Sequence, residues 1–369
     1  MMASLVAKLR AATSALKRMG QVGALVLLLP AGVALALYGM DHSASPPMDG
    51  DGPALASRSA PELERTLQPA AGIGGAVGYD RQIVARIFGS PQRDESLDPA
   101  MVALGHELFH EPRLSATGAV SCASCHILAE GGDDNRARSL GASGQPTARN
   151  SPTIYNLAGH VAYFWDGRAA SLTEQIDGPV HHPDEMATDW EQIVATLRDD
   201  PTYAARFKEV FDGRPTEGRV KEAIVAFELS LVTDDTPFDR YLAGDDAALS
   251  ERAMQGLGLF MDLGCASCHQ GPLVGGNLFQ RIGIYEAFLH GEGADAIFKV
   301  PSLRNVTETA PYLHDGSVAT IEEAIRIMGR HQLGHDMTGD EEAALLAFLQ
   351  SLTSPSLADG TRALDEADQ

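Results

Sequence analysis

The pentapeptide Cys122-Ala-Ser-Cys125-His126 occurs a second time as Cys265-Ala-Ser-Cys268-His269, and the architecture of the chain follows from this pair. The pattern C-x-x-C-H is typical of c-type haem attachment. Its two thiols form thioethers with the haem vinyl groups, and the adjacent histidine binds the iron as proximal ligand. The two motifs use all four cysteines of the chain. The sequence therefore predicts two covalently attached haems.

Two C-x-x-C pairs are also compatible with one four-thiolate zinc site or with dithiol redox chemistry. A zinc ribbon separates its pairs by about 15–20 residues, whereas here the second pair begins 265 − 125 = 140 positions after the first ends. Neither alternative explains why a histidine directly follows both pairs. Haem attachment is therefore the favoured interpretation.

The N-terminal segment, residues 1–40, has the pattern of an export signal. Basic residues precede an uncharged, largely apolar run at 22–40; they are Lys8, Arg10, Lys17 and Arg18. The run is long enough for a retained membrane anchor, while Pro30 and the small residues at 34–36 also suit a cleaved signal peptide. With the basic flank inside, the rest of the chain lies outside the cytoplasm. We expect a periplasmic protein, either released or anchored to the inner membrane.

Length and composition predict two haem domains behind a linker. Residues 41–75 are rich in Ser, Pro and Gly, which predicts a flexible linker. The remaining length suits roughly two domains. We expect an N-terminal haem domain at 76–235, a C-terminal haem domain at 236–353 and a mobile acidic tail at 354–369.

The chain is strongly acidic, with 28 Lys and Arg against 50 Asp and Glu, a net charge of −22. Without the four basic residues of the leader the charge is −22 − 4 = −26. This excess argues against a nucleic-acid partner. It is the ordinary composition of a solvated surface, and it also suits the attraction of a positively charged electron carrier.

Apolar residues recur at helical spacing in several windows, which predicts a mainly α fold of two cytochrome c-like helical domains. Each domain would bind one haem. Asp98-Pro99 is expected to start one helix, Thr188 a second and Asp340 the last. A further helix at about 220–232 is expected to cross between the domains. A short internal repeat, Leu108-Phe109 and Leu259-Phe260 before the two haem motifs, supports a shared plan for the two halves.

Several longer motifs stand in order around the two haem sites. They are Leu104-Gly-His-Glu-Leu-Phe-His-Glu-Pro-Arg-Leu-Ser115, Arg149-Asn-Ser-Pro-Thr153, Phe164-Trp-Asp-Gly-Arg-Ala169 and Val300-Pro-Ser-Leu-Arg-Asn305. On these motifs the chain resembles the bacterial di-haem cytochrome c peroxidases, a superfamily that includes the MauG-type enzymes, from about Leu97 to Leu352. The resemblance implies a peroxide-reactive haem in the N-terminal domain and an electron-entry haem in the C-terminal domain.

For the electron-entry haem, the resemblance implies Met328 as the second axial ligand opposite His269. A thioether ligand raises the reduction potential, which suits a haem that accepts electrons. Thr320 and Glu323 form a capping box, so Met328 also fits an ordinary helical core stripe. His331 is a nearby competitor for the iron.

For the peroxidatic haem, many members of the family carry a distal histidine at the position that here is Ala142. Alanine cannot bind iron, so we expect a pocket open to peroxide without prior reduction, as in the MauG-type enzymes. His160, His181 and His182 are alternative ligands.

The resemblance also assigns roles to Glu185 and Trp165. Glu185, at the position of the family's distal glutamate, is the expected acid–base catalyst, and burial above a haem would raise its pKa. Without the flanking motif it would be an ordinary surface carboxylate. Trp165 lies where the family places a tryptophan between the haems, although a buried aromatic alone needs no such role.

A calcium ion between the domains is implied in the same way. Asn150, Thr309 and Pro311 match the family's calcium site, which uses side-chain and backbone oxygens and water. His314, in the motif Thr309-Ala-Pro-Tyr-Leu-His-Asp-Gly316, is expected to orient groups near the second haem.

The resemblance implies a cytochrome c peroxidase that reduces hydrogen peroxide to water with electrons from a small exported cytochrome c or cupredoxin. An alternative is a MauG-type enzyme that oxidises side chains of a partner protein, which Ala142 favours and Met328 disfavours. A third is an electron-transfer di-haem cytochrome without catalysis. Relatives are often homodimers, which makes a homodimer a further expectation.

Overall fold

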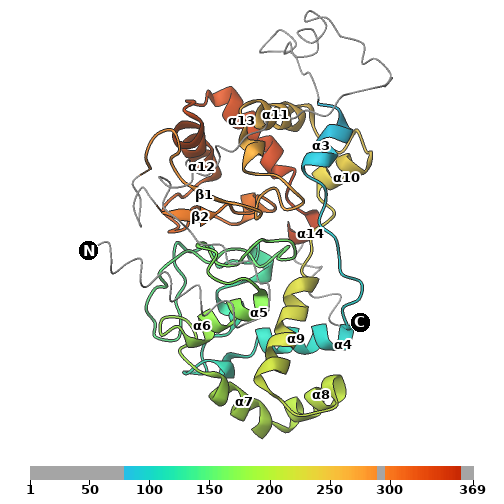
Figure 1. The fold of residues 1–369 in the computed structure, drawn as a ribbon, viewed down its shortest axis with the longest axis vertical. Helices are drawn as coiled ribbons and strands as arrows, with labels where there is room; N and C mark the ends of the chain where they lie inside the picture. The colour runs from blue at the N-terminus through green and yellow to red at the C-terminus, as the bar shows by residue number, and fades with distance from the viewer. Residues whose placement is uncertain (1–78, 289–295, 359–369) are drawn as a thin grey trace, which may run out of the picture. The chain divides into compact units, whose positions relative to one another are not determined.

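The fold is mainly helical with a short antiparallel hairpin, in a computed structural model that describes residues 79–288 and 296–358 (Figure 1). The helices are α3 (Arg81–Ile87), α4 (Pro99–Phe109), α5 (Leu172–Gln175), α6 (Asp177–His181), α7 (Trp190–Asp199), α8 (Pro201–Phe211), α9 (Glu217–Ser230), α10 (Pro237–Ala243), α11 (Glu251–Asp262), α12 (Ile321–Ile327), α13 (Gly339–Gln350) and α14 (Pro355–Ala358). Strands β1 (Phe279–Arg281) and β2 (Ile297–Lys299) pair antiparallel, with Phe279 opposite Lys299. The predicted mainly α fold is confirmed, while the sequence did not predict the hairpin.

The expected leader at 1–40 and linker at 41–75 lie outside the described residues. All described residues belong to one compact unit. Within this part of the chain, no helix combines the length and the apolar character that crossing a bilayer requires.

Buried side chains form two separate hydrophobic cores, which define two lobes. The first core draws mainly on α4, α7, α8 and α9, and the second on α3, α10, α11 and α13. In each lobe the helix before the haem motif crosses a later helix, α4 with α9 and α11 with α13. Gly105 in α4 and Gly256 in α11 stand at these crossings, where a Cβ would overlap the carbonyl group of Ala223 or Ala344. Glycine is costly inside a helix, but here it allows the two backbones to touch.

The internal repeat extends well beyond Leu108-Phe109 and Leu259-Phe260. Asn156 and Asn305, separated by 305 − 156 = 149 positions, both adopt the left-handed conformation with φ of 59°. Isolated bridges repeat at the same offset, Tyr163 with Ala169 and Tyr312 with Val318. The predicted common plan of the two halves is therefore confirmed by equivalent contacts.

Most predicted helices are present, with ends set by local capping. Asp98 caps α4 with Pro99 at its first position, as predicted. Asp189, rather than Thr188, accepts the capping hydrogen bond of α7. Thr338 caps α13, which begins at Gly339, one residue before the expected start at Asp340. The helix expected to cross between the domains, α9, stays in the first core, and the segment 231–236 that follows it makes the crossing.

The two lobes exchange short segments across the expected boundary near residue 235. Val84 and Phe88, on α3 and just after it, pack into the second core although they precede the first haem motif. Leu357 on α14 packs into the first core, so residues 355–358, which the sequence assigned to a mobile tail, are helical. The residues after 358 lie outside the described part. These exchanges tie each end of the described chain to the lobe that is distant in sequence.

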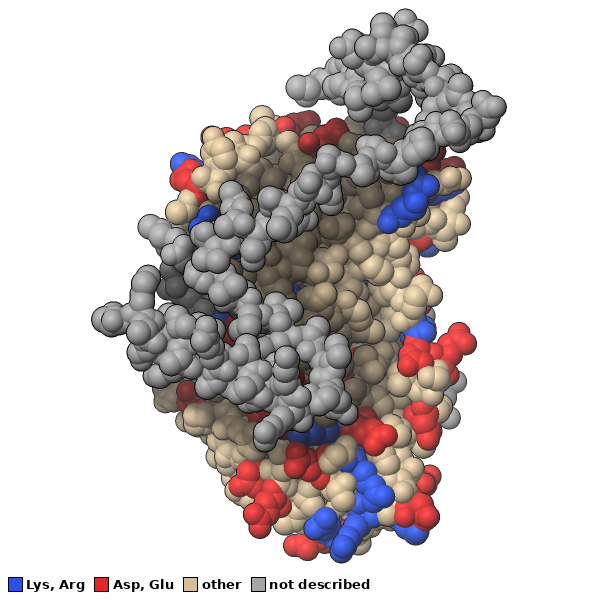
Figure 2. All heavy atoms as spheres, viewed as in Figure 1, with Lys and Arg blue, Asp and Glu red and all other residues tan. Residues whose placement is uncertain are grey.

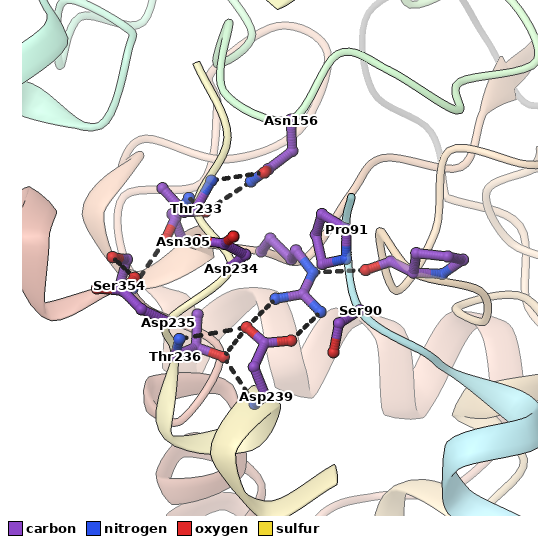
Figure 3. Close-up of polar contacts among 12 residues, drawn as sticks. Ser90, Pro91, Asn156, Thr233, Asp234, Asp235, Thr236, Asp239, Asn305 and Ser354 are labelled. Carbon is purple, nitrogen blue, oxygen red and sulfur yellow. Dashed lines mark hydrogen bonds and ion pairs between the residues drawn. The ribbon is translucent and has the colours of Figure 1, made fainter. Parts of the chain in front are cut away.

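A buried polar network surrounds the crossing segment (Figure 3). Thr233 exchanges two hydrogen bonds with Asn156 of the first lobe, Asn156 Nδ2 to Thr233 Oγ1 at 2.7 Å and Thr233 N to Asn156 Oδ1 at 2.9 Å. Asn305 Nδ2 of the second lobe donates to the same hydroxyl at 3.1 Å. One threonine thus joins both lobes at the point where the chain crosses.

Arg304 is fully buried in this region and forms a bidentate ion pair with Asp239, with both N–O distances 2.8 Å. Burial alone would raise the pKa of Asp239, but the Arg304 guanidinium and the Thr236 hydroxyl outweigh it, so the pKa lies below its usual range. Both residues are therefore charged. The cost of removing the two charges from water is offset only because the bidentate geometry is good.

We predict that Asp239→Asn lowers the free energy of unfolding by about 3–5 kcal/mol, because the Arg304 charge would stay buried without its carboxylate. Unfolding by denaturant measures this change. Asp212→Asn, at the exposed Lys208–Asp212 pair, is the matched control and should change it by less than about 1 kcal/mol. An Asp239→Asn effect as small as that of the control would contradict the prediction.

Candidate functional site

A single cavity of about 850 Å³ is lined by residues of both lobes. This is at the upper end of ordinary ligand pockets. The residues that the sequence assigned first to haem, catalysis and calcium, as distinct from the alternative histidine ligands, all line it; they are Cys122, Cys125, His126, Asn150, Trp165, Glu185, Cys265, Cys268, His269, Thr309, Pro311 and Met328. Residues far apart in the sequence therefore face one space, which is large enough to be a cofactor site.

The first haem motif forms a 3₁₀ turn, Cys122–Ser124, which follows Ser121 and ends at Cys125. His126 Nδ1 lies 3.1 Å from the Gly132 carbonyl oxygen, which leaves Nε2 as the nitrogen that can bind a metal. Burial lowers the pKa of His126, so the ring is neutral, as a metal ligand must be.

The second motif repeats this geometry as the turn Cys265–Ser267. Burial lowers the pKa of His269 to about 4, opposed by the nearby Val274 and Pro301 carbonyl groups. Neither carbonyl reaches hydrogen-bond geometry with the buried Nδ1. His269 is thus a neutral imidazole in the cavity, equivalent to His126. Its Nδ1 lacks the hydrogen bond to a carbonyl oxygen that His126 Nδ1 has.

The four cysteines do not assemble into a common metal site. In the described ranges, no group of three or more His, Cys, Asp or Glu side chains is arranged to hold a metal ion. Burial raises the pKa of Cys122 to about 12 and that of Cys265 to about 11, so these thiols are neutral in the free protein. The structure gives no support to the zinc alternative. Two separate Cys-Cys-His turns on one cavity fit covalent haem attachment.

Glu185 lies in the part of the cavity that belongs to the first lobe. Burial raises its pKa, and the electrostatic influence of the neighbouring His182 and of the Arg168 guanidinium opposes this rise. His182 Nδ1 is 3.8 Å from Glu185 Oε1, and the Arg168 guanidinium lies over the Phe164 ring at 3.4 Å. A half-buried carboxyl with a raised pKa is suited to acid–base chemistry.

The Ala142 loop is held directly against Glu185. Ala142 N donates to the Glu185 carbonyl oxygen at 2.6 Å. Gly141 is buried beneath it, where a Cβ would overlap the Asp184 carbonyl group. Gly141 lines the cavity but Ala142 does not, so this loop presents no iron-binding side chain to it.

The three alternative histidines for this pocket are placed differently. His181 does not line the cavity, and its Nδ1 lies 3.2 Å from the Thr188 carbonyl oxygen. His182 and His160 do line it. His182 faces Glu185, and His160 Nδ1 lies 3.0 Å from Lys299 Nζ.

Met328 begins a π-helical turn, Met328–Leu333, directly after α12. The regular α-helix, in which Met328 would have been an ordinary core residue, ends here. π-Helical turns are frequent at functional sites. Met328 lines the cavity, whereas His331 does not; its Nδ1 lies 3.0 Å from the Glu286 carbonyl oxygen and its ring packs on Phe288. Of these two side chains, Met328 is the one placed to reach a metal in the cavity.

Trp165 connects the two lobes through its own backbone and side chain. Its Nε1 donates to the Asn150 carbonyl oxygen at 2.9 Å, within the first lobe. Its carbonyl oxygen accepts from Lys299 N of the second lobe at 2.8 Å. A reciprocal bond runs from Asn150 N to the His314 carbonyl oxygen at 3.0 Å. His314 is buried and stacks on Phe298 at 4.2 Å.

Asn150, Thr309 and Pro311 face the cavity at the same junction of the lobes. Asn150 Nδ2 donates to the Arg136 carbonyl oxygen at 3.0 Å, which fixes the amide orientation. The donors are an amide and backbone carbonyl groups, which suit a hard cation that keeps several waters.

Two cavity residues escaped the sequence reasoning. Glu228 on α9 is buried with its Oε2 unpartnered, and burial raises its pKa to about 8. Lys299 directly precedes the motif Val300-Pro-Ser-Leu-Arg-Asn305, and its place next to this motif is the feature by which the sequence could have identified it. Nothing in the local pattern around Glu228 marks it, because a glutamate near a helix end is ordinarily exposed.

The surface agrees with the acidic composition. On the face drawn in Figure 2, the coloured Lys and Arg side chains lie among Asp and Glu side chains.

Comparisons with known proteins point to one family. The sequence profile of the family described as di-haem cytochrome c peroxidase matches residues 99–247. The chain is 42% identical over 266 residues to the cytochrome c551 peroxidase of Nitrosomonas europaea, covering 69% of this chain and 80% of the relative. It is 36% identical over 264 residues to the methylamine utilization protein MauG of Methylorubrum extorquens, covering 68% and 72%.

A solved structure agrees with these sequence matches. The crystal structure of a MauG-like protein associated with microbial copper homeostasis superimposes with a TM-score of 0.65 and 29% identity. The superposition covers 80% of this chain and 99% of that one. The similarity therefore covers both lobes, beyond residues 99–247 that the profile matches. The chain belongs to the di-haem cytochrome c peroxidase family and is a haem-dependent oxidoreductase of the peroxidase type.

Proposed function

We propose that the protein is a cytochrome c peroxidase that reduces hydrogen peroxide to two waters, with two protons and two electrons from a small exported cytochrome c or cupredoxin. The observation that carries this proposal is the position of Glu185. Its carboxyl, with a raised pKa, shares one cavity with both haem motifs and with Met328. A plain electron-transfer cytochrome would have no use for such a group.

The residues of the two motifs fit covalent haems. Two c-type haems, when bound, supply the redox chemistry. Cys122 and Cys125 would hold one haem and Cys265 and Cys268 the other. Their histidines would be the proximal ligands, and Met328 the second ligand in the second lobe. The support is the neutral, buried state of both imidazoles and the cavity that all these residues share.

Glu185 is the group that takes the proton of bound peroxide and returns it to the leaving oxygen. The nearby His182 and Arg168 stabilise the carboxylate form, which takes the proton in the first step and is restored when the proton is returned; between the two steps the carboxyl is neutral. Because Ala142 offers no ligand, the first-lobe pocket needs no displacement of a side chain before peroxide enters. Trp165, bonded to both lobes, is the proposed path for electrons between them.

We also propose a calcium site, a cellular location, domain bounds and an oligomeric state for the protein. Asn150, Thr309 and Pro311 would hold a calcium ion at the junction of the lobes. The N-terminal segment would direct export to the periplasm, as a signal peptide or an inner-membrane anchor. The haem domains are proposed to be 76–235 and 236–353 with the exchanges described above, and the protein a homodimer, as its relatives often are.

A second candidate is a MauG-type enzyme that oxidises side chains of a partner protein. Ala142 favours it, because a permanently open pocket is a feature of those enzymes. Met328 argues against it, since that lineage tends to carry tyrosine at the corresponding position. The electron-entry role implied by a thioether ligand favours the peroxidase.

The proposed function predicts equal turnover before and after reduction. Peroxide-dependent oxidation of a reduced small cytochrome c is measured for the fully oxidised protein and for protein first reduced by one electron. We expect rates that agree within about twofold, because the Ala142 pocket is open in both. Turnover only after reduction would mean that another residue blocks the pocket. Haem bands that change with peroxide while no cytochrome is oxidised would favour the protein-modifying function.

A further inference from the structure

Lys299 and His160 form a basic pair inside the haem cavity. Lys299 Nζ lies 3.0 Å from His160 Nδ1, and both residues line the cavity. Burial lowers the pKa of Lys299 to about 8. Burial, with the charge of Lys299, lowers the pKa of His160 to about 3. The imidazole is therefore neutral and accepts the hydrogen bond from the ammonium group.

In the described part of the chain, no carboxylate lies within ion-pair distance of Lys299. Lys299 Nζ also lies 5.9 Å from the centre of the Tyr163 ring. An ammonium group taken from water without an opposing anion is costly, so a buried lysine normally has a partner. The pair is thus a site that an anion in the cavity would complete.

The internal repeat shows what this pair corresponds to in the other half of the molecule. The offset of 149 positions relates Lys299 to Asn150 (299 − 149 = 150) and His160 to Thr309 (160 + 149 = 309). It also relates Ala162 to Pro311 (162 + 149 = 311). These counterparts are the three residues of the proposed calcium site.

The backbone supports this correspondence independently. Lys299 N donates to the Trp165 carbonyl oxygen at 2.8 Å, and Asn150 N donates to that of His314 at 3.0 Å. Trp165 and His314 are themselves related by the same offset, since 165 + 149 = 314. The two junctions are therefore equivalent positions of one repeat, one lined by an amide and carbonyl groups and the other by an ammonium group.

We propose that Lys299, oriented by His160, is a built-in cation that takes the place of the metal ion of the equivalent junction and binds a haem propionate carboxylate. This proposal rests on the proposed function, because it requires haem in the cavity and a calcium ion at the equivalent junction. It makes Lys299 a cofactor-binding residue. It also explains why the two equivalent junctions differ in sequence: one relies on a bound ion and the other on its own side chain.

The test is the reduction potential of both haems in the haem-loaded protein, measured by spectroelectrochemistry in Lys299→Met. Removing a positive charge beside a propionate disfavours the reduced haem. We expect the reduction equilibrium of one haem to fall about tenfold, which is about 59 mV for a one-electron couple. Lys299→Arg should restore most of the shift. Lys208→Met, an exposed lysine remote from the cavity, should leave both potentials unchanged.

A second variant tests the equivalence of the junctions. Lys299→Asn combined with His160→Thr copies the residues of the proposed calcium site. We expect its shifted haem potential to respond to added Ca²⁺, whereas that of Lys299→Met does not. Potentials of Lys299→Met that match the parent would overturn the proposal. A parent protein that contains two haems but does not reduce peroxide would refute the proposed function alone, because the potentials can still be compared.

Discussion

Glu185→Gln is expected to lower kcat/KM for hydrogen peroxide by about 10²–10⁴-fold, the usual contribution of a positioned acid–base group. The amide keeps the shape of the side chain but cannot take the peroxide proton. The cavity, the haem motifs and the contact between Ala142 N and the Glu185 carbonyl oxygen do not depend on the carboxyl. Stopped-flow measurement of the reaction of peroxide with the haem bands separates this step from electron delivery.

The pH profile provides a second reading of the same group. Burial raises the pKa of Glu185, and His182 and Arg168 only partly oppose this. The carboxylate is the active form, so activity should rise with pH through a pKa above the usual carboxyl range. In Glu185→Gln this rise of activity with pH should be absent. It should not merely occur at another pH.

Asp184→Asn is the matched control for Glu185→Gln. Asp184 is the preceding residue, but it does not line the cavity, and its Oδ1 accepts from Ser143 Oγ at 3.2 Å. We expect its rate to remain within about twofold of the parent. If Glu185→Gln reacted with peroxide as fast as this control, Glu185 would not be the acid–base catalyst.

The sequence predicts the fold best where local chemistry is decisive. Asp98-Pro99 sets the start of α4 because both the cap and the first helical position are specified by adjacent residues. The C-x-x-C-H motifs likewise specify their own turns. The exchange of α3 and α14 between the lobes was not predictable in this way. Val84 and Leu357 have local patterns that suit either core, and the choice depends on packing across the whole chain.

The candidate site shows the same division. Residues inside recognisable motifs, such as Glu185 and Met328, could be named from the sequence. The Lys299–His160 contact joins positions 139 apart, and its chemistry depends on burial that no local pattern records. Glu228 is missed for the same reason, since its environment comes from the assembled cavity.

Met328→His is expected to lower the reduction potential of the second haem by on the order of 0.2 V, a substantial part of the about 0.8 V that axial ligands span. A thioether favours the reduced iron, whereas an imidazole favours the oxidised form. Because the donor must reduce this haem, steady-state turnover with a reduced cytochrome should fall steeply. The reaction of peroxide with the oxidised protein should persist, since Glu185 and its pocket lie in the other lobe. Spectroelectrochemical titration measures the potential directly.

Met337→Ala is the control that shows whether the effect on the potential is specific to Met328. Met337 is a second methionine of the same lobe that lines the cavity, and it packs close to Gly329, beside Met328. If Met328 is the ligand, Met337→Ala should leave the potential of the second haem nearly unchanged, and Met328→Ala should lower it. The reverse pattern would transfer the assignment to Met337. The π-helical turn at Met328–Leu333 favours the first outcome, because it departs from the regular helix at the residue that is proposed to bind the iron.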